Sequence, residues 1–393
     1  MFLYLKAMNS RVVHFIIAGT VGLIVTIFFG LGIFDSWQAV IVDRLLPASP
    51  PDKRAVIVAL DKRALEKFGT LPWPAATLAT VLRQFEPSKP AVVAIIPSII
   101  NESANFSGDD KLKSLLEGLS YRLVLPVRAD ERHRISPTLV EAIKIIKPPS
   151  FFTQFSQISY GHPYFSTDDH ITIRSLPPVL TRKLTTYLDV RGQGEYYEPI
   201  AYESAIRSRL SSDKIEPVNG LLLYSGKAGN VPTFSLADLD SGALNKDFFN
   251  NKIVFVGLTG TSSARTLSAP SSFGKMEDVE IHAQLASMLL QPRKAIPVVP
   301  IDPLSGVARL FVAALVPAFS IQLFRSRRGI VLSNSMIGLL YFVMTAMLAR
   351  QGQLLPVLYL QVAWFFSLVL CFGYLYWIKN VKQEVFPSKQ DEF

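Results

Sequence analysis

Two histidines and two aspartates lie close together in the stretch GHPYFSTDDHITIR, residues 161–174. Imidazole and carboxylate groups are common metal ligands, so this group could hold an ion. The isoleucines at its end alternate as in a strand, however, and Thr-Asp-Asp-His is typical of a tight turn. We therefore predict a hairpin turn and no metal site at His162, Asp168, Asp169 and His170.

A second candidate site is the stretch LDKRALEKFGTLPWP, residues 60–74, which begins where a strand-like apolar run ends. Ligand crevices in α/β proteins form at the carboxyl ends of strands, so Asp61, Trp73 and Pro74 could line a sensory cleft. The competing interpretation is structural. Trp73 would then be a core anchor, Asp61 would cap the helix that follows it, and Pro74 would start the next helix, where its missing N–H has no partner to lose.

The other residues that could do chemistry are weaker candidates. The loop GLTGTSS, residues 257–263, could offer backbone amides to an anion, but it lacks the lysine of a P-loop and the third glycine of a dinucleotide fingerprint. His282 lies among apolar residues on a predicted helix, where a packed histidine is expected rather than a general base. The single cysteine, Cys371, excludes an intrachain disulfide. Because the sequence has no nucleophile elbow and no paired carboxylates, we expect no enzyme and no cofactor.

The segment that carries most of these residues alternates between strand and helix patterns. Buried-type strands are expected at RAVIVAL, AVVAII, LLLYSG and KIVFVG, which are residues 54–60, 91–96, 221–226 and 252–257. Helices are expected at residues 74–85 and 278–290. A strand, a helix and a second strand of this length form a βαβ unit with a parallel strand pair. The predicted fold class is therefore α/β, with a partly parallel sheet.

Four apolar runs are long enough to cross the ~30 Å hydrocarbon core of a membrane as helices. They are residues 12–34, 304–324, 329–349 and 354–378. The first run is too long for the apolar part of a signal peptide and has no cleavage site after it, which favours an uncleaved anchor. The remaining segments are an N-terminus (1–11), a domain of residues 35–303, short connections and a tail (379–393).

Lysine and arginine indicate which side of the membrane each segment faces. The net charge is +9, yet residues 35–303 hold 30 Lys or Arg against 28 Asp or Glu. The excess lies at the two ends and in the connection at residues 325–328. Because the basic side is cytoplasmic, we expect both termini in the cytoplasm of a bacterium and residues 35–303 in the periplasm. The sequence has no basic stretch interleaved with aromatic residues, so nucleic-acid binding is not expected.

The order of these elements resembles the type-two CHASE family, an extracytoplasmic sensory domain of bacterial receptors. The similarity begins at residues 60–96 and continues in YSGKAGNVPTFSLADL, NNKIVFVGLTG and MEDVEIHAQLASMLL, which are residues 224–239, 250–260 and 276–290. The last two are similar to the family's segments GKIVLVG and PGVEIHA. One span before the domain and three after it is also the family's arrangement, so the resemblance extends over residues 12–378.

This resemblance bears on the candidate cleft. Where the family has an arginine after its WPWP stretch, this chain has Ala75, and where the family has an acid at the end of the second strand, this chain has Ile96 and Pro97. If those charged groups bind a ligand in relatives, part of that pocket is missing here. The difference favours the core-anchor interpretation of Trp73.

The resemblance also implies a function. The family's receptors continue after the last span into a cytosolic cyclase or kinase, whereas the fifteen residues KNVKQEVFPSKQDEF that follow here are too few for such a domain. We therefore expect a non-catalytic inner-membrane sensory or scaffolding subunit that acts through a separate membrane, periplasmic or cytosolic protein. The family's receptors suggest a homodimer as well.

Two alternatives stay open from the sequence. One is a structural subunit of a cell-envelope complex, whose periplasmic domain binds protein rather than a small ligand. The other, with the least support, is a periplasmic enzyme. In the spans, which contact membrane lipids, Asn334 and Gln361 are the candidates for hydrogen bonds between helices.

Overall fold

The computed structural model divides the chain into two compact units, residues 47–297 and residues 1–46 with 298–393. We call the first the α/β unit and the second the membrane unit. The residues that the structure describes are 10–45, 52–96, 106, 109–129, 145–146, 149–165, 172–174, 176–177, 179–180, 184–185, 196–211, 215, 222–239, 247–270, 273–291, 303–324, 326–349 and 356–385.

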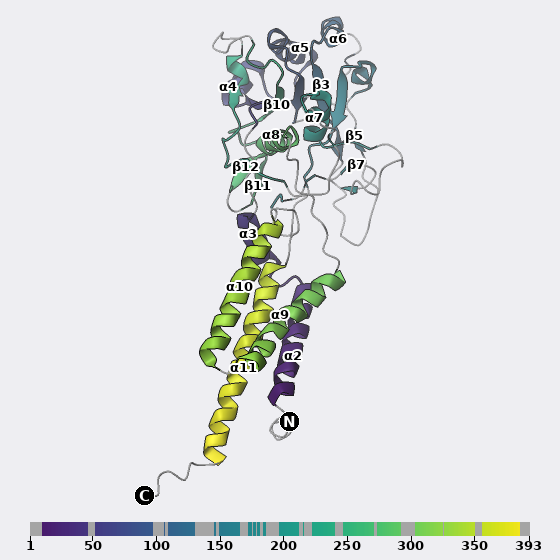
Figure 1. Cartoon of the computed structure of the whole chain (residues 1–393). Coiled ribbons are helices and arrows are strands. Elements are labelled where there is room, and N and C mark those ends of the chain that lie inside the picture. The colour runs from purple at the N-terminus through teal and green to yellow at the C-terminus, as the bar shows by residue number, and fades with distance from the viewer. Residues whose placement is uncertain are drawn as a thin grey trace, which may run out of the picture. The chain divides into compact units, whose positions relative to one another are not determined.

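The α/β unit is built on a six-stranded sheet with the order β6-β3-β2-β10-β1-β9, in which every neighbouring pair is parallel (Figure 1). Its strands are β1 (Ala55–Leu60), β2 (Val92–Ile95), β3 (Arg122–Pro126), β6 (Ile158–Gly161), β9 (Thr233–Ser235) and β10 (Ile253–Leu258). The predicted α/β class is confirmed. The sheet is more fully parallel than predicted, because even the edge strands β6 and β9 run with their neighbours.

Both faces of the sheet are covered, because successive side chains of a strand point to opposite sides. On one face, Ile57 belongs to a buried cluster that includes residues of α7 (Ile200–Ser208) and α8 (Asp278–Leu289). On the other face, Val58 belongs to a second cluster with the remaining helices of the unit. These are α4 (Lys62–Phe68), α5 (Ala75–Arg83) and α6 (Asp110–Glu117). Burial on both faces explains why the strands read as continuous apolar runs.

One predicted strand does not form. Residues 222–225 are buried or half-buried but irregular, although their sequence has the same apolar pattern as β1 and β10. The amide of Leu222 donates to the carbonyl of Arg174 at 2.8 Å, and the amide of Ser225 donates to Oε1 of Gln284 at 3.0 Å. This segment therefore satisfies its backbone groups with a loop and a side chain of α8 rather than with a neighbouring strand.

The smaller elements of the α/β unit are short. The paired strands outside the main sheet are β4 (Arg128–Ala129) with β5 (Ile145–Ile146), β7 (Val179–Leu180) with β8 (Leu184–Thr185), and β11 (Thr266–Ser268) with β12 (Lys275–Glu277). All three pairs are antiparallel. The 3₁₀ helices are η1 (Glu86–Ser88), η3 (Ser150–Gln154) and η5 (Leu236–Asp238).

The membrane unit contains four helices that are long and apolar enough to span a membrane, one before the α/β unit in the sequence and three after it, as predicted (Figure 1). They are α2 (Ser10–Gly30), α9 (Pro303–Leu323), α10 (Arg327–Ala349) and α11 (Val357–Val385). Val21 of α2, Leu310 of α9 and Tyr359 of α11 are all at most 4% exposed and share one buried cluster. Three of the four helices therefore contribute fully buried residues to a common core, and Tyr341 of α10 packs against it.

A short helix, α3 (Asp35–Leu45), also belongs to the membrane unit. The hydroxyl of Tyr359 donates to Oδ1 of Asp35 at 2.7 Å and accepts from the amide of Phe34 at 2.9 Å. The side chain of Gln38 accepts from the amide of Leu358 at 2.8 Å. The compact α/β unit is therefore shorter than the segment 35–303 predicted from the ends of the apolar runs, because α3 packs on α11.

Candidate functional site

Trp73, the first candidate for a sensory cleft, lies in the core of the α/β unit. Its side chain is 1% exposed and belongs to the cluster on the α4–α6 face of the sheet. The indole Nε1 donates to the carbonyl of Gly69 at 3.0 Å, and the ring meets Phe68 edge to face at 6.4 Å between centroids. Apolar packing and a satisfied N–H are what a large buried indole requires. This is the position that the core-anchor interpretation expects.

Asp61, the second candidate, caps α4. Its Oδ1 accepts from the amide of Ala64 at 2.9 Å and from the hydroxyl of Ser235 at 2.9 Å. The cap satisfies one of the amides that the first turn of a helix leaves without a partner. Pro74 is the N-cap of α5, so that helix starts at Ala75, one residue later than predicted. A sensory role for these three residues stays a prediction.

The histidine candidates are buried side chains. His162 is 0% exposed, and its Nδ1 accepts from the amide of Tyr164 at 3.2 Å. Asp168, Asp169 and His170 lie outside the described residues, so the predicted hairpin turn lies there too. His282 is 0% exposed, and its ring lies 4.4 Å from that of Phe165 between centroids, tilted by 35°. Across the part of the chain that the structure describes, no three His, Cys, Asp or Glu side chains come together as a metal site.

The glycine-containing loop after β10 is already bonded to a carboxylate of the protein. The amide of Gly260 donates to Oε1 of Glu277 at 2.6 Å. An external anion at that amide would have to displace Glu277. The weak anion-site signal in GLTGTSS therefore corresponds to an internal contact with the end of β12.

Two side chains of α8 fasten the loop that precedes β9. Oε1 of Glu280, which is 7% exposed, accepts from the amides of Gly229 and Asn230 at 2.7 and 3.2 Å. One turn later, Oε1 of Gln284 accepts from the amide of Ser225 at 3.0 Å. Burial raises the pKa of Glu280, although these amide bonds work in the opposite direction. The segments 224–239 and 276–290 are thus joined by hydrogen bonds that stabilise the carboxylate.

A second carboxylate, that of the half-buried Glu198, lies just before α7. Its Oε2 is buried and has no hydrogen-bond partner among the described residues. Burial raises the pKa of Glu198 to about 7, and the negative charge of Glu203 adds to the shift. Glu203 itself is bonded to Arg207 one turn along α7, with Nε 2.7 Å from Oε1. Glu198 is therefore a group whose charge changes near neutral pH.

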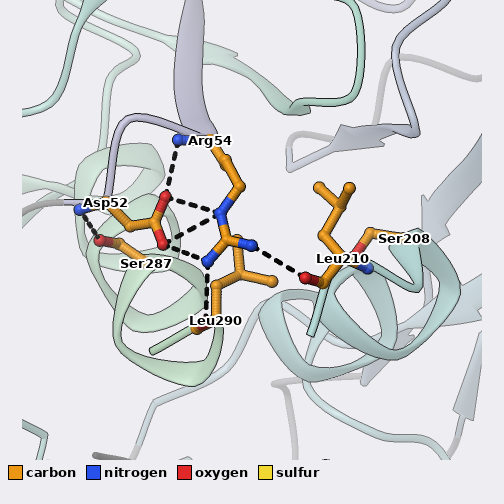
Figure 2. Close-up of polar contacts among 6 residues, drawn as sticks. All are labelled: Asp52, Arg54, Ser208, Leu210, Ser287 and Leu290. Atoms are coloured by element: carbon orange, nitrogen blue, oxygen red, sulfur yellow. Dashed lines mark hydrogen bonds and ion pairs between the residues drawn. The ribbon is translucent and has the colours of Figure 1, made fainter. Parts of the chain in front are cut away.

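Arg54, just before β1, joins three segments of the α/β unit (Figure 2). Its Nε lies 3.0 and 3.1 Å from the two carboxylate oxygens of Asp52, and its Nη2 lies 2.6 Å from Oδ2. Nη1 donates to the carbonyl of Leu210 at 2.8 Å, and Nη2 donates to the carbonyl of Leu290 at 2.8 Å. The amide of Asp52 donates to Oγ of Ser287 at 2.6 Å. We call Asp52, Arg54, Leu210, Ser287 and Leu290 the Arg54 hub.

The charges around Arg54 stabilise the hydrogen bonds of the hub. The carbonyls of Leu210 and Leu290 lie at the C-terminal ends of α7 and α8, where unpaired carbonyls concentrate partial negative charge that a guanidinium stabilises. Burial by itself would raise the pKa of Asp52, but the hydrogen bonds and charge of Arg54 outweigh it, so this pKa lies below its ordinary value. The side chains of Asp52 and Arg54 are 12% and 39% exposed, so the pair is only partly screened by water.

The hub occupies a particular place in the chain. Asp52 comes soon after α3 ends at Leu45, and Leu290 comes soon before α9 begins at Pro303. The hub therefore ties the first and last described segments of the α/β unit to each other. Only one feature of the sequence pointed to it, the charged residues that bound the first buried strand.

Of the two residues predicted to form hydrogen bonds between helices, Asn334 does so and Gln361 does not among the described residues. Asn334 of α10 is 1% exposed, and its Nδ2 donates to Oγ of Ser320 in α9 at 2.6 Å. Its Oδ1 accepts from Nε1 of Trp364 in α11 at 3.1 Å. Asn334 thus bonds two helices of its own bundle. Gln361 is half-buried, lines a cavity, and makes no hydrogen bond to a described residue.

Comparison with known proteins gives one match. A family model described as CHASE2 domain matches residues 20–318, which include the whole α/β unit and parts of α2 and α9. Neither a curated protein nor a solved structure matches the chain.

Proposed function

The chain belongs to the CHASE2 domain family, and on that basis we propose that it is a non-catalytic subunit of the bacterial inner membrane that acts through a separate protein. CHASE2 domains are extracytoplasmic and sensory, so the family confirms the resemblance found in the sequence and supports a sensory role. The four long apolar helices support attachment to a membrane. The finer parts of the proposal are the orientation, the partner and the absence of catalysis.

The proposed orientation has both termini in the cytoplasm and residues 35–303 in the periplasm. Its support is the distribution of Lys and Arg, which are in excess at the two ends of the chain and at residues 325–328. An even number of spans is consistent with both ends being on one side. The extracytoplasmic location of CHASE2 domains agrees with the same arrangement.

The observation that carries the proposed mechanism is the Arg54 hub. A change that displaces the C-terminal end of α7 or α8 must also displace Arg54, because one guanidinium bonds Leu210, Leu290 and Asp52. Asp52 and Leu290 belong to the first and last described segments of the α/β unit, which adjoin the membrane unit in the sequence. We propose that the hub couples the state of the α/β unit to the spanning helices. A ligand or protein bound to the α/β unit would act by preferring one of two arrangements of these segments.

The partner is proposed to be reached through the helices or the α/β unit rather than through the tail. The test is affinity purification of the full chain and of a chain lacking Lys379–Phe393, from the native host in mild detergent, with an untagged strain as control. We expect the same partner with both chains. Loss of the partner on deletion would assign the contact to the tail. Nucleotide-cyclase or kinase activity in the purified chain would contradict a non-catalytic subunit.

A further inference from the structure

A cavity of about 1050 Å³ lies within the membrane unit, between α9, α10 and α11. This volume is slightly above the ~300–1,000 Å³ typical of small-molecule sites. Most of its lining is apolar, with Val312, Val316, Leu339 and Phe365 among the side chains. Trp364 lines it as well and is held in place by its hydrogen bond to Asn334.

Three polar side chains in the lining have hydrogen-bonding capacity that the protein does not use. Arg309 is exposed, and no carboxylate lines the cavity or forms an ion pair with it among the described residues. The Tyr341 hydroxyl is buried without a hydrogen-bond partner in the described part of the chain, and neighbouring Thr345 donates instead to the Tyr341 carbonyl at 2.9 Å. The third is Gln361. A buried hydroxyl without a partner is unfavourable, and with the exposed guanidinium beside it this favours a ligand that supplies acceptors.

These three groups lie at one end of the bundle. Arg309 is six residues after the start of α9, Gln361 is four residues after the start of α11, and Tyr341 is eight residues before the end of α10. At 1.5 Å per residue, all three are roughly 6–12 Å from the same end. The apolar lining residues Val316 and Ile337 lie deeper along their helices. The cavity is therefore polar near its end and apolar toward the middle of the bundle.

We propose that this cavity binds an anionic phospholipid. An acyl chain would fill the apolar part, and the phosphate would accept from the guanidinium of Arg309 and from the groups beside it. A guanidinium recognises phosphate with parallel, charge-assisted hydrogen bonds. A lipid provides the anion and the apolar chain in one molecule, whereas a partner helix would have to bring a carboxylate into the bilayer at considerable cost.

The test is native mass spectrometry of the full-length protein in detergent, titrated with phosphatidylglycerol or with phosphatidylcholine of the same acyl chains. We expect phosphatidylglycerol to bind more tightly. Arg309→Gln should weaken phosphatidylglycerol binding roughly tenfold, the factor that corresponds to ~1.4 kcal/mol, and should weaken phosphatidylcholine binding less, because the positive charge of choline lies beside the phosphate that both lipids share. The matched control is Arg328→Gln, at an exposed arginine of α10 outside the cavity, which should keep the preference.

A second variant tests the apolar part of the site. Ala308 is exposed and lines the cavity, so the indole of Ala308→Trp should occupy part of it and weaken both lipids without changing the melting temperature. Equal affinity of the wild type for the two lipids, or an unchanged preference in Arg309→Gln, would overturn the proposal. If Ala308→Trp releases a co-purified protein while lipid binding stays the same, the cavity receives a partner helix and the lipid assignment is wrong.

Discussion

Replacing Arg54 by glutamine should destabilise the α/β unit by about 2–4 kcal/mol. Hydrogen bonds to charged groups contribute ~1.5–3 kcal/mol each, and breaking a fully buried ion pair costs ~3–5 kcal/mol because one charge is left without a partner. Asp52 is 12% exposed and would become that charge, while Arg54 is 39% exposed, which reduces the loss by solvent screening. The carbonyls of Leu210 and Leu290 would also lose their donor.

The assay is hydrogen–deuterium exchange of the full-length protein in nanodiscs, measured peptide by peptide. The same measurement at increasing denaturant concentration gives the stability of the α/β unit. Exchange should rise in the C-terminal turns of α7 and α8 and stay unchanged in α5, which the hub does not contact. The matched control is Arg63→Gln. Arg63 also makes two bonds to a carboxylate, that of Asp238, but the side chains are 60% and 42% exposed, so only a small effect is expected.

A double-mutant cycle separates the hub from a general loss of stability. Arg54→Gln and Asp52→Asn should be non-additive, because each removes the same ion pair. The pair also predicts a pH dependence. Since the folded pKa of Asp52 is lowered, its stabilisation is present above the ordinary value of 3.8 and is lost as pH falls through the lower folded pKa. Additive single changes, or an Arg54→Gln effect no larger than that of Arg63→Gln, would refute this account of the hub.

Three further predictions concern other parts of the chain. Trp73→Ala should cost roughly 3–5 kcal/mol in chemical unfolding, because the indole is 1% exposed; an unchanged stability with lost partner binding would instead make it a cleft residue. Glu198→Gln should raise the melting temperature relative to wild type at pH 8 but not at pH 4. The reason is that a carboxyl with a raised folded pKa stabilises the fold fully below pH 4.5 and loses this stabilisation as pH rises through about 7. Equal shifts of the melting temperature at both pH values would contradict this prediction. In a Cys371→Ser background, single cysteines are placed at Ser107, Ser326 and Ser388. An impermeant maleimide applied to intact cells should label the cysteine at position 107, in the α/β unit, and neither of the other two. Strong labelling at position 326 or 388 would reverse the proposed orientation.

The sheet and the spans could be predicted because their signals are local. The runs at residues 54–60 and 252–257 correspond within a residue to β1 and β10, since strands buried on both faces are continuously apolar. The run at residues 221–226 has the same pattern but packs irregularly, with its amides bonded to a loop and to Gln284. An apolar run shows that a segment is buried, and does not show whether a neighbouring strand is available to it.

The bonds of the Arg54 hub to Leu210, Leu290 and Ser287 could not be predicted, because they are long-range. Leu210 and Leu290 contribute carbonyls, which every residue has, so no side-chain pattern marks them. The role of Glu280 was missed for a related reason, since its partners are the amides of Gly229 and Asn230. The role of Asp61 was easier to predict, because an N-cap residue bonds the helix that directly follows it.

The central claim, that this chain is a subunit acting through another protein, is tested most directly by the mass of the assembly it forms. The measurement is native mass spectrometry of the tagged wild-type chain, purified from its native host in mild detergent, with each component identified by peptide sequencing. We predict an assembly that contains a second polypeptide in a fixed ratio to the chain. A homogeneous species that contains only this chain, whether monomeric or dimeric, would contradict the claim.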